Sequence, residues 1–292
     1  MDQPRADAVK PKAAEARVAC HLGELVQGRL GPSGPVALVT LPCPALSVRA
    51  HFVPSERDGL HTEDPLARRV AEAAAHHLDQ PHLSGNLTVA AEAPMGGGAG
   101  VSTATGLATL RAIARSIGAT LTAEEESALL LSIEGATDPL AFPATPPRLW
   151  APREARTLEI LPPLPAMTIV GGFDGPGQRT DPADTAFPDA TELFAALRHG
   201  RDPAAIAKAA TASAVANQAR NPKPHWAELN AIAAAEGALG IAVAHTGSAV
   251  ALLFPPGHPP PLEPLQRLGL RQIVAWTLED AAPGVEPIRP GR

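Results

Sequence analysis

The sequence predicts an α+β protein with two lobes, and three observations carry this prediction. Hydrophobic residues make up 45% of the 292 residues, enough to bury a sizeable core. Strand-like stretches come in runs mixed with pairs of helices, instead of alternating strictly as in a parallel sheet. A proline-rich crossing at 142–165 divides the pattern, in line with about 150 residues per domain.

The composition narrows the class of protein. The net charge is −6 and aromatic residues make up 3%, with no tyrosine, which argues against a nucleic-acid partner. Cys20 and Cys43 are too few for a disulfide framework and show no zinc spacing, so we expect both to be buried in strands. The first 17 residues lack the apolar core of a secretion signal. No apolar run is long enough to span a membrane, so a cytoplasmic protein without a membrane partner is expected.

The elements of the first half follow from turn signals and periodicity. We expect a flexible leader over 1–16 and a first lobe over 17–150. Thr122 is the expected N-cap of a helix, with Glu125 at the capping-box position. The predicted strands are 17–21, 36–41, 46–52 and 86–91, and the predicted helices are 65–78, one from near residue 102, and 122–134.

The second lobe is expected over 166–280, followed by a flexible tail over 281–292. Its predicted strands are 167–173, 240–245, 248–254 and 272–278, and its predicted helices are 190–199, 203–220 and 225–239, with one more helix between the last two strands.

The segment 92–106, EAPMGGGAGVSTATG, is the most informative part of the chain. Its glycines allow the backbone to turn freely, and a helix follows whose N-terminus Ser102 and Thr103 could cap. Free amides at the positive end of a helix dipole make an anion site, most commonly for phosphate. The segment lacks the lysine of a nucleotide P-loop and does not fit G-x-G-x-x-G. A flexible turn that merely caps a core helix is the alternative.

Three motifs carry a resemblance to a known family. The pattern P-x-x-x-G-x-G-x-S-x-A over 94–104 resembles the phosphate loop of the galactokinase, homoserine, mevalonate and phosphomevalonate (GHMP) kinase superfamily. The sequence HLGELVQG over 21–28 is similar to a motif of its L-threonine kinase branch, and AHTGSA over 244–249 resembles the C-terminal glycine motif. The segment 213–218 also resembles that branch. Val101, Ala99, Gly97 and Thr105 depart from the usual loop.

The resemblance implies a two-lobed GHMP kinase fold, with a ribosomal protein S5 domain 2-like N-terminal lobe and a ferredoxin-like C-terminal lobe. It implies ATP and Mg²⁺ as cofactors, with Asp138 and Ser102 as catalytic residues and Ser102 and Glu134 as metal ligands. The nucleotide-binding residues it implies are Pro94, Gly96, Gly97, Gly98, Ala99, Gly100, Val101, Ser102 and Thr103. Surface carboxylates near a turn are the alternative for Glu134 and Asp138.

The acceptor site is expected on three further segments. By resemblance, Glu24 and Gln27 contact the substrate, and Gly247 and Ser248 bring a hairpin toward the phosphate loop. The loop after strand 167–173 adds Thr180 and Asp181, where Asp181 either holds an ammonium group or belongs to a plain turn.

These expectations together predict an ATP-dependent kinase that phosphorylates L-threonine, in the aminopropanol arm of cobalamin biosynthesis. The alternatives are a kinase for another small alcohol (homoserine, ethanolamine or a sugar) and a non-catalytic nucleotide-binding regulator. The expected partner is the small-molecule acceptor, and a homodimer is left open.

Overall fold

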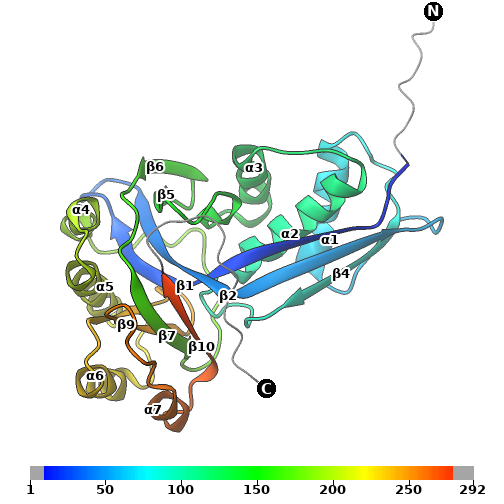
Figure 1. Ribbon diagram of the computed structural model, residues 1–292. Coiled ribbons are helices and arrows are strands. Elements are labelled where there is room, and N and C mark those ends of the chain that lie inside the picture. Colours follow the sequence, from blue (N-terminus) through cyan, green and yellow to red (C-terminus); the bar gives the residue numbers. More distant parts are fainter. Residues whose placement is uncertain (1–9, 279–292) are drawn as a thin grey trace, which may run out of the picture.

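The computed structural model describes residues 10–278 and contains one ten-stranded sheet with helices packed around it (Figure 1). The strand order is β10-β7-β9-β8-β1-β2-β4-β3, and β5 and β6 branch from β2. The strands are β1 (Ala14–Arg29), β2 (Val36–Pro54), β3 (Leu60–His61), β4 (Gly85–Ala91), β5 (Arg148–Ala151), β6 (Arg156–Ile160), β7 (Met167–Phe173), β8 (Gly240–Val243), β9 (Ala249–Phe254) and β10 (Arg271–Leu278). The helices are α1 (Pro65–His77), α2 (Val101–Ser116), α3 (Ala123–Glu134), the 3-10 helix η1 (Pro139–Ala141), α4 (Thr191–His199), α5 (Pro203–Asn217), α6 (Trp226–Ala235) and α7 (Leu262–Arg267). The α+β prediction is confirmed.

The long antiparallel pair β1 and β2 runs through both halves of the molecule (Figure 1). The sequence predicted two strands where β2 is one, because Pro42 and Pro44 read as breaks. Both prolines lie where the register with β1 shifts, between the pairs Ala19↔Ser47 and Glu24↔Thr40. Proline is tolerated at such irregularities, since few ladder hydrogen bonds are lost there.

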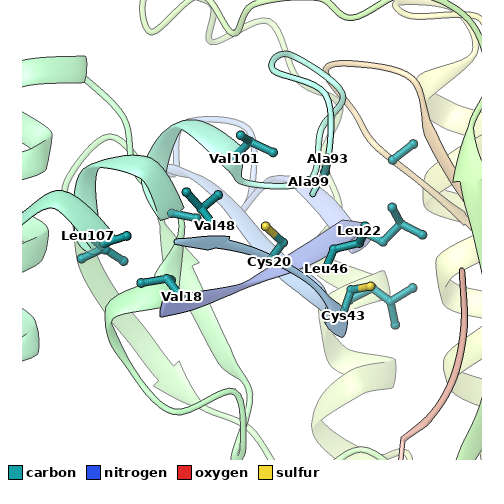
Figure 2. Close-up of a cluster of buried hydrophobic side chains, with 14 of the residues drawn as sticks. Val18, Cys20, Leu22, Cys43, Leu46, Val48, Ala93, Ala99, Val101 and Leu107 are labelled. Carbon is teal, nitrogen blue, oxygen red and sulfur yellow. The ribbon is translucent and has the colours of Figure 1, made fainter. Parts of the chain in front are cut away.

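The core of the first half lies between this pair of strands and α2. Figure 2 shows Val18, Cys20 and Val48 from the strands close to Val101 and Leu107 of α2. Leu107, Leu110 and Ile113 of this helix are fully buried.

Cys20 and Cys43 are both free and buried, as predicted. Burial raises the pKa of each thiol to about 12, so neither is a reactive thiolate near neutral pH.

Helix α3 begins as the sequence predicts. The Thr122 hydroxyl accepts a hydrogen bond from the Glu125 N–H (3.2 Å), and the Glu125 carboxylate accepts one from the Thr122 N–H (2.7 Å). Both halves of the capping box are therefore present. The helix ends at Gly135, whose φ of 76° is the left-handed conformation common at a helix C-terminus.

The second half joins the first through β8, which pairs with β1 at Glu24↔Val243. Helix α5 packs against both of these strands and keeps them together (Figure 1). The predicted strands and helices of this half are present, with ends that differ by a few residues.

No strand was predicted within the proline-rich crossing at 142–165. This crossing contains the hairpin of β5 and β6, and β5 pairs with β2 at Leu38↔Trp150. The hairpin was missed because its strands are four and five residues long and lie among prolines. Trp150 is fully buried, and its indole N–H donates to the carbonyl of Thr137 (2.7 Å).

The first described residues can be compared with the predicted leader. Strand β1 begins at Ala14, inside the leader predicted over 1–16. The residues 1–9 of the leader, and the tail predicted over 281–292, lie outside the described residues. Among residues 10–278, no helix combines the length and apolarity that crossing a bilayer requires.

Candidate functional site

The glycine-rich segment before α2 is held by its carbonyl groups. Every carbonyl from residue 96 to residue 100 accepts a hydrogen bond from a backbone N–H. The donors are Gln178 for Gly96, Ser248 and Ala249 for Gly97, Gly23 for Gly98, His21 for Ala99 and Ala104 for Gly100. In a trans peptide the N–H points away from the carbonyl. The amides of 98–100 therefore face away from the protein, and none of them donates to another group within residues 10–278.

The backbone conformation of this loop suits an anion. Gly96, Gly98 and Gly100 have φ values of 75°, 79° and 65°, and the residues between them do not have positive φ. Alternation of left- and right-handed residues turns successive N–H groups toward one point and forms an anion-binding concavity. Helix α2 begins directly after Gly100, so the positive end of its dipole adds to the concavity.

The turn at 244–248 packs directly against the glycine-rich loop. A Cβ added to Gly98 would lie 2.2 Å from the Cβ of Ala244 and 2.5 Å from the carbonyl oxygen of Thr246. A Cβ added to Gly247 would lie 2.5 Å from the amide nitrogen of Gly98. The predicted approach of this hairpin to the loop is present in the structure, and it leaves no room for side chains between them.

The prediction that Ser102 and Thr103 cap α2 is wrong. The N-cap is Gly100, and no side chain caps the helix. The Ser102 hydroxyl instead donates to a carboxylate oxygen of Glu134, at the end of α3. The Thr103 hydroxyl lies 3.2 Å from the N–H of Asp138 and accepts its hydrogen bond. These two side chains thus join the loop to both predicted carboxylates.

The carboxylates of Glu134 and Asp138 lie close enough to repel each other. Burial raises the pKa of Glu134, and the charge of Asp138 adds to this, while the hydrogen bond from Ser102 opposes it. The Oε1 atom of Glu134 is buried and has no partner among the described residues. A buried carboxylate oxygen without a partner is an atom that a cation could satisfy.

His21 faces Asp138 from the opposite side of the loop. Its Nε2 lies 3.3 Å from a carboxylate oxygen of Asp138, and its Nδ1 lies 3.1 Å from the carbonyl oxygen of Gly23. Burial alone would lower the pKa of His21, but Asp138, Glu24 and the Gly23 carbonyl outweigh it, so the pKa is raised. When the ring is protonated, Nδ1 can donate to the Gly23 carbonyl and Nε2 can form an ion pair with Asp138.

A pocket of about 660 Å³ opens in front of the loop, between the two halves of the chain. The predicted site residues that line it are Glu24, Gln27, Gly96, Gly98, Gly100, Val101, Ser102, Thr103, Glu134, Asp138 and Thr180. The structure therefore brings together side chains from β1, the loop, α2, α3 and the segment after β7.

Other predicted residues do not line the pocket; they are Pro94, Gly97, Ala99, Asp181, Gly247 and Ser248. Gly97, Ala99 and Ser248 act through the backbone hydrogen bonds that anchor the loop. Asp181 is exposed, and its Oδ1 accepts a hydrogen bond from the N–H of Ala183 (2.9 Å), which is the plain-turn alternative.

Sequence reasoning missed several charged residues of the pocket. Arg69, Arg153 and Arg179 line it, and they come from α1, the β5–β6 turn and the segment after β7. The charges of Arg69 and Arg179 act to lower the pKa of Glu134, so both arginines lie near its carboxylate. No motif marks these positions, because each arginine lies outside the matched patterns.

Lys223 is a fourth missed cation, and it is buried beside the 244–248 turn. Its ammonium group donates to the carbonyl of Gly247 (2.7 Å), which also accepts a hydrogen bond from Asn221 (3.0 Å). Burial lowers the pKa of Lys223 to about 8, although Glu24 and Asp174 oppose this. The lysine thus supports the turn that packs against the glycine-rich loop.

We expect this lowered pKa to appear in the stability of the protein. Between pH 8 and pH 10.5 the unfolded chain binds a proton at Lys223 that the folded chain does not, so stability rises with pH. From pH 7.5 to 9.5, wild type should gain about 2 kcal/mol in urea unfolding relative to Lys223→Met. Lys208 is exposed, and Lys208→Met is the control. Wild type should show no such gain in stability relative to this variant. A pH-independent difference between wild type and Lys223→Met would contradict the prediction.

The residues present fit Mg²⁺ as a partly hydrated ion. Within residues 10–278 there is no group of three or more His, Cys, Asp or Glu side chains that could hold a metal alone. Mg²⁺ is commonly bound by one or two protein oxygens together with phosphates and waters. The unpartnered Oε1 of Glu134 and the adjacent hydroxyl of Ser102 are such oxygens.

Comparisons with known proteins show what this arrangement is similar to. Residues 65–142 match the family model for the GHMP kinases N terminal domain, and this segment contains the loop, Ser102, Glu134 and Asp138. A comparison with curated proteins finds no match.

Solved structures share the fold over nearly the whole chain. The mevalonate kinase of Methanococcus jannaschii is 12% identical, with a TM-score of 0.66 over 92% of this chain and 98% of that one. The homoserine kinase of Cytophaga hutchinsonii is 15% identical, with a TM-score of 0.60 over 95% and 96%. The mevalonate pyrophosphate decarboxylase of Streptococcus pyogenes is 13% identical, with a TM-score of 0.66 over 96% and 100%.

The chain therefore has the GHMP kinase fold, and within it residues 65–142 match the GHMP kinases N terminal domain. The predicted fold class is confirmed. At such low identity the likeness concerns the fold, and the similar structures differ in the molecules that their names specify.

Proposed function

We propose that this protein transfers the γ-phosphoryl group of ATP to the hydroxyl of a small molecule, with L-threonine as the leading acceptor. The observation that carries the proposal is the loop at 96–100, whose carbonyls all accept hydrogen bonds from the protein and whose amides at 98–100 face outward. Phosphoryl transfer depends mainly on positioning and charge neutralisation, and such a loop supplies both.

The nucleotide phosphates would lie against the amides of 98–100 and the N-terminus of α2. Ser102 and Glu134 would hold Mg²⁺. When bound, this ion neutralises charge on the phosphate oxygens. Arg69 and Arg179 supply further positive charge at the same wall of the pocket, which compensates for the absence of a lysine in the loop.

Asp138 is the group placed to act on the acceptor hydroxyl. In the transfer, the hydroxyl oxygen bonds to the γ-phosphorus, its proton passes to Asp138, and the bond to the ADP oxygen breaks. The ion pair with His21 (3.3 Å) and the backbone hydrogen bond to Thr103 (3.2 Å) fix the aspartate. Because His21 is buried, its ring has little freedom to release that carboxylate.

L-threonine is proposed as the acceptor because of the segment 21–28 and its position. The segment resembles the L-threonine kinase branch, and its Glu24 and Gln27 line the pocket. The product would be O-phospho-L-threonine, which belongs to the aminopropanol arm of cobalamin biosynthesis. Homoserine, ethanolamine and sugars remain rival acceptors, since the fold is shared by enzymes whose names specify different substrates.

An acceptor screen tests the proposal. Release of ADP from Mg-ATP is measured with L-threonine, L-serine, L-homoserine, ethanolamine and a sugar, and L-threonine is expected to give the highest kcat/KM. A higher value with another alcohol would leave the kinase proposal standing and overturn the acceptor. A flat response to all of them, with ATP bound, would favour a nucleotide-binding regulator.

Ser102→Ala is expected to weaken the use of Mg-ATP far more than the fold. One hydrogen bond to a charged group contributes about 1.5–3 kcal/mol, so kcat/KM for Mg-ATP should fall about 10- to 100-fold. The Tm should fall by only a few degrees, because the Ser102 hydroxyl makes one hydrogen bond, to Glu134, and does not cap a helix. Ser132→Ala, which removes an exposed hydroxyl bonded to the Leu129 carbonyl of α3, is the matched control. Comparable losses of activity and stability in Ser102→Ala would show that the hydroxyl is only structural.

A further inference from the structure

A chain of three buried polar side chains ends at the wall of the pocket. Glu24 of β1, His245 of the 244–248 turn and Ser213 of α5 are each less than a tenth exposed. The Oε2 atom of Glu24 lies 2.8 Å from the backbone nitrogen of His245 and 3.3 Å from its Nδ1. The Nε2 atom of His245 lies 2.9 Å from the hydroxyl oxygen of Ser213. Three separate segments of the polypeptide thus meet at the carboxylate of Glu24.

The hydrogen-bond donors of this series of side chains follow from its end at Ser213, away from the pocket. The backbone N–H of Gln27 can only donate, and it points to the hydroxyl oxygen of Ser213 (3.2 Å). The Ser213 hydroxyl keeps its own proton available for Nε2 of His245, and in this arrangement the ring proton that faces Glu24 lies on Nδ1. That Nδ1–H donates to Oε2 of Glu24, as does the His245 N–H. Every group is satisfied when Glu24 is an anion, because two donors point at one of its oxygens.

The other oxygen of Glu24 is directed to the pocket. Glu24 lines the pocket, whereas His245 and Ser213 do not. No hydrogen bond within residues 10–278 engages Oε1, and this atom is not among the buried unpartnered ones. It is therefore a negatively charged acceptor that a ligand can reach.

The nearby cations do not neutralise this oxygen through a direct bond. Lys223 lies close enough to sense the charge of Glu24, but its ammonium group donates to the Gly247 carbonyl. His21 also senses Glu24, but its ring is paired with Asp138 and with the Gly23 carbonyl.

We propose that Glu24 binds a cationic amine of the acceptor, and that His245 and Ser213 are positioning residues that aim its carboxylate. This inference rests on the proposed function and narrows its acceptors to amino alcohols. Sugars and other uncharged alcohols are then excluded as preferred acceptors. The chain from Gln27 to Glu24 also explains why the carboxylate does not turn away toward Lys223.

Binding measurements test this inference without requiring phosphoryl transfer. Calorimetry, with Mg²⁺ and a non-hydrolysable ATP analogue present, compares L-threonine with 3-hydroxybutyrate, which lacks the amine, and ethanolamine with ethylene glycol. Wild type should bind each amine about 10- to 100-fold more tightly than its amine-free partner, as expected for a charged hydrogen bond. Glu24→Gln should remove this preference.

The positioning role predicts a graded series. His245→Ala and Ser213→Ala should reduce the preference for the amine at least threefold, without changing the Kd of the nucleotide analogue. Ser213→Thr keeps the hydroxyl and should restore the preference. Ser116→Ala, a buried serine whose hydroxyl donates to the Ile113 carbonyl of α2 (2.8 Å), is the matched control and should behave as wild type.

Several outcomes would overturn the inference. The first is that wild type binds amines and amine-free alcohols equally, or binds neither. The second is that the preference for the amine survives Glu24→Gln. The third is that His245→Ala and Ser213→Ala lose affinity for the nucleotide and the acceptor together. The kinase proposal is judged separately, by ADP release. An amine preference without turnover would contradict that proposal and support the assignment of Glu24.

Discussion

Gly98→Ala is expected to reduce the affinity for Mg-ATP by at least about 100-fold, which corresponds to about 2.7 kcal/mol. The added methyl group would lie 2.2 Å from the Cβ of Ala244 and 2.5 Å from the Thr246 carbonyl oxygen, so the loop must move away from its support. The φ of 79° at this position adds strain for any residue with a side chain. Displacement of the loop turns the amides of 98–100 away from their common point, and the measurement is a calorimetric Kd for a nucleotide analogue.

Gly118→Ala is the matched control for this variant. Gly118 follows α2 with a φ of 72°, and an added Cβ would meet nothing within 4 Å. It therefore carries the conformational strain of Gly98→Ala without the collision, and it should lower stability by about 1–2 kcal/mol while nucleotide affinity stays at the wild-type value. Wild-type affinity in Gly98→Ala would show that the loop is not the phosphate site.

Asp138→Asn is expected to lower kcat about 10²- to 10⁴-fold, the usual contribution of a general base. The asparagine keeps the size of the side chain and its place beside Thr103, so the Kd for the nucleotide should change less than about twofold. The proton of the acceptor hydroxyl then has no carboxylate to receive it. Steady-state kinetics with the best acceptor of the screen, together with calorimetry, separate these two effects.

The same variant should change the titration of His21. Asp138 is a main cause of the raised pKa of His21, and without that charge burial is opposed only by Glu24 and the Gly23 carbonyl. The pKa of His21 should therefore fall, which NMR titration of the ring can follow. Asp181→Asn, which alters an exposed carboxylate outside the pocket, should leave both kcat and this pKa unchanged. Unchanged kcat in Asp138→Asn would exclude the aspartate as the base.

Part of the site could be predicted because it depends on short stretches of chain. The loop needs glycine where φ is positive, and Gly96, Gly98 and Gly100 occupy those positions. The start of α3 needs Thr122 and Glu125 three residues apart, and both capping hydrogen bonds are present. These features require only that neighbouring residues have the right backbone freedom and side-chain length.

Other predictions failed where a distant partner decided the outcome. Ser102 was expected to cap α2, but its hydroxyl bonds to Glu134, 32 residues away. No strand was predicted among the prolines of 142–165, but β5 pairs with β2 there and Trp150 of β5 is fully buried. In both cases local preference was outweighed by packing and by the need to pair polar groups.

The sequence by itself determined the α+β class, most of the helices and strands, and a glycine loop suited to phosphate. Only the tertiary structure decided which polar and charged groups meet. His21 meets Asp138, Lys223 meets the Gly247 carbonyl, and Glu24 meets His245, which is 221 residues away. The physical reason is that backbone freedom is a property of each residue and its neighbours. The partner of a buried polar group depends on which segments the folded sheet brings together.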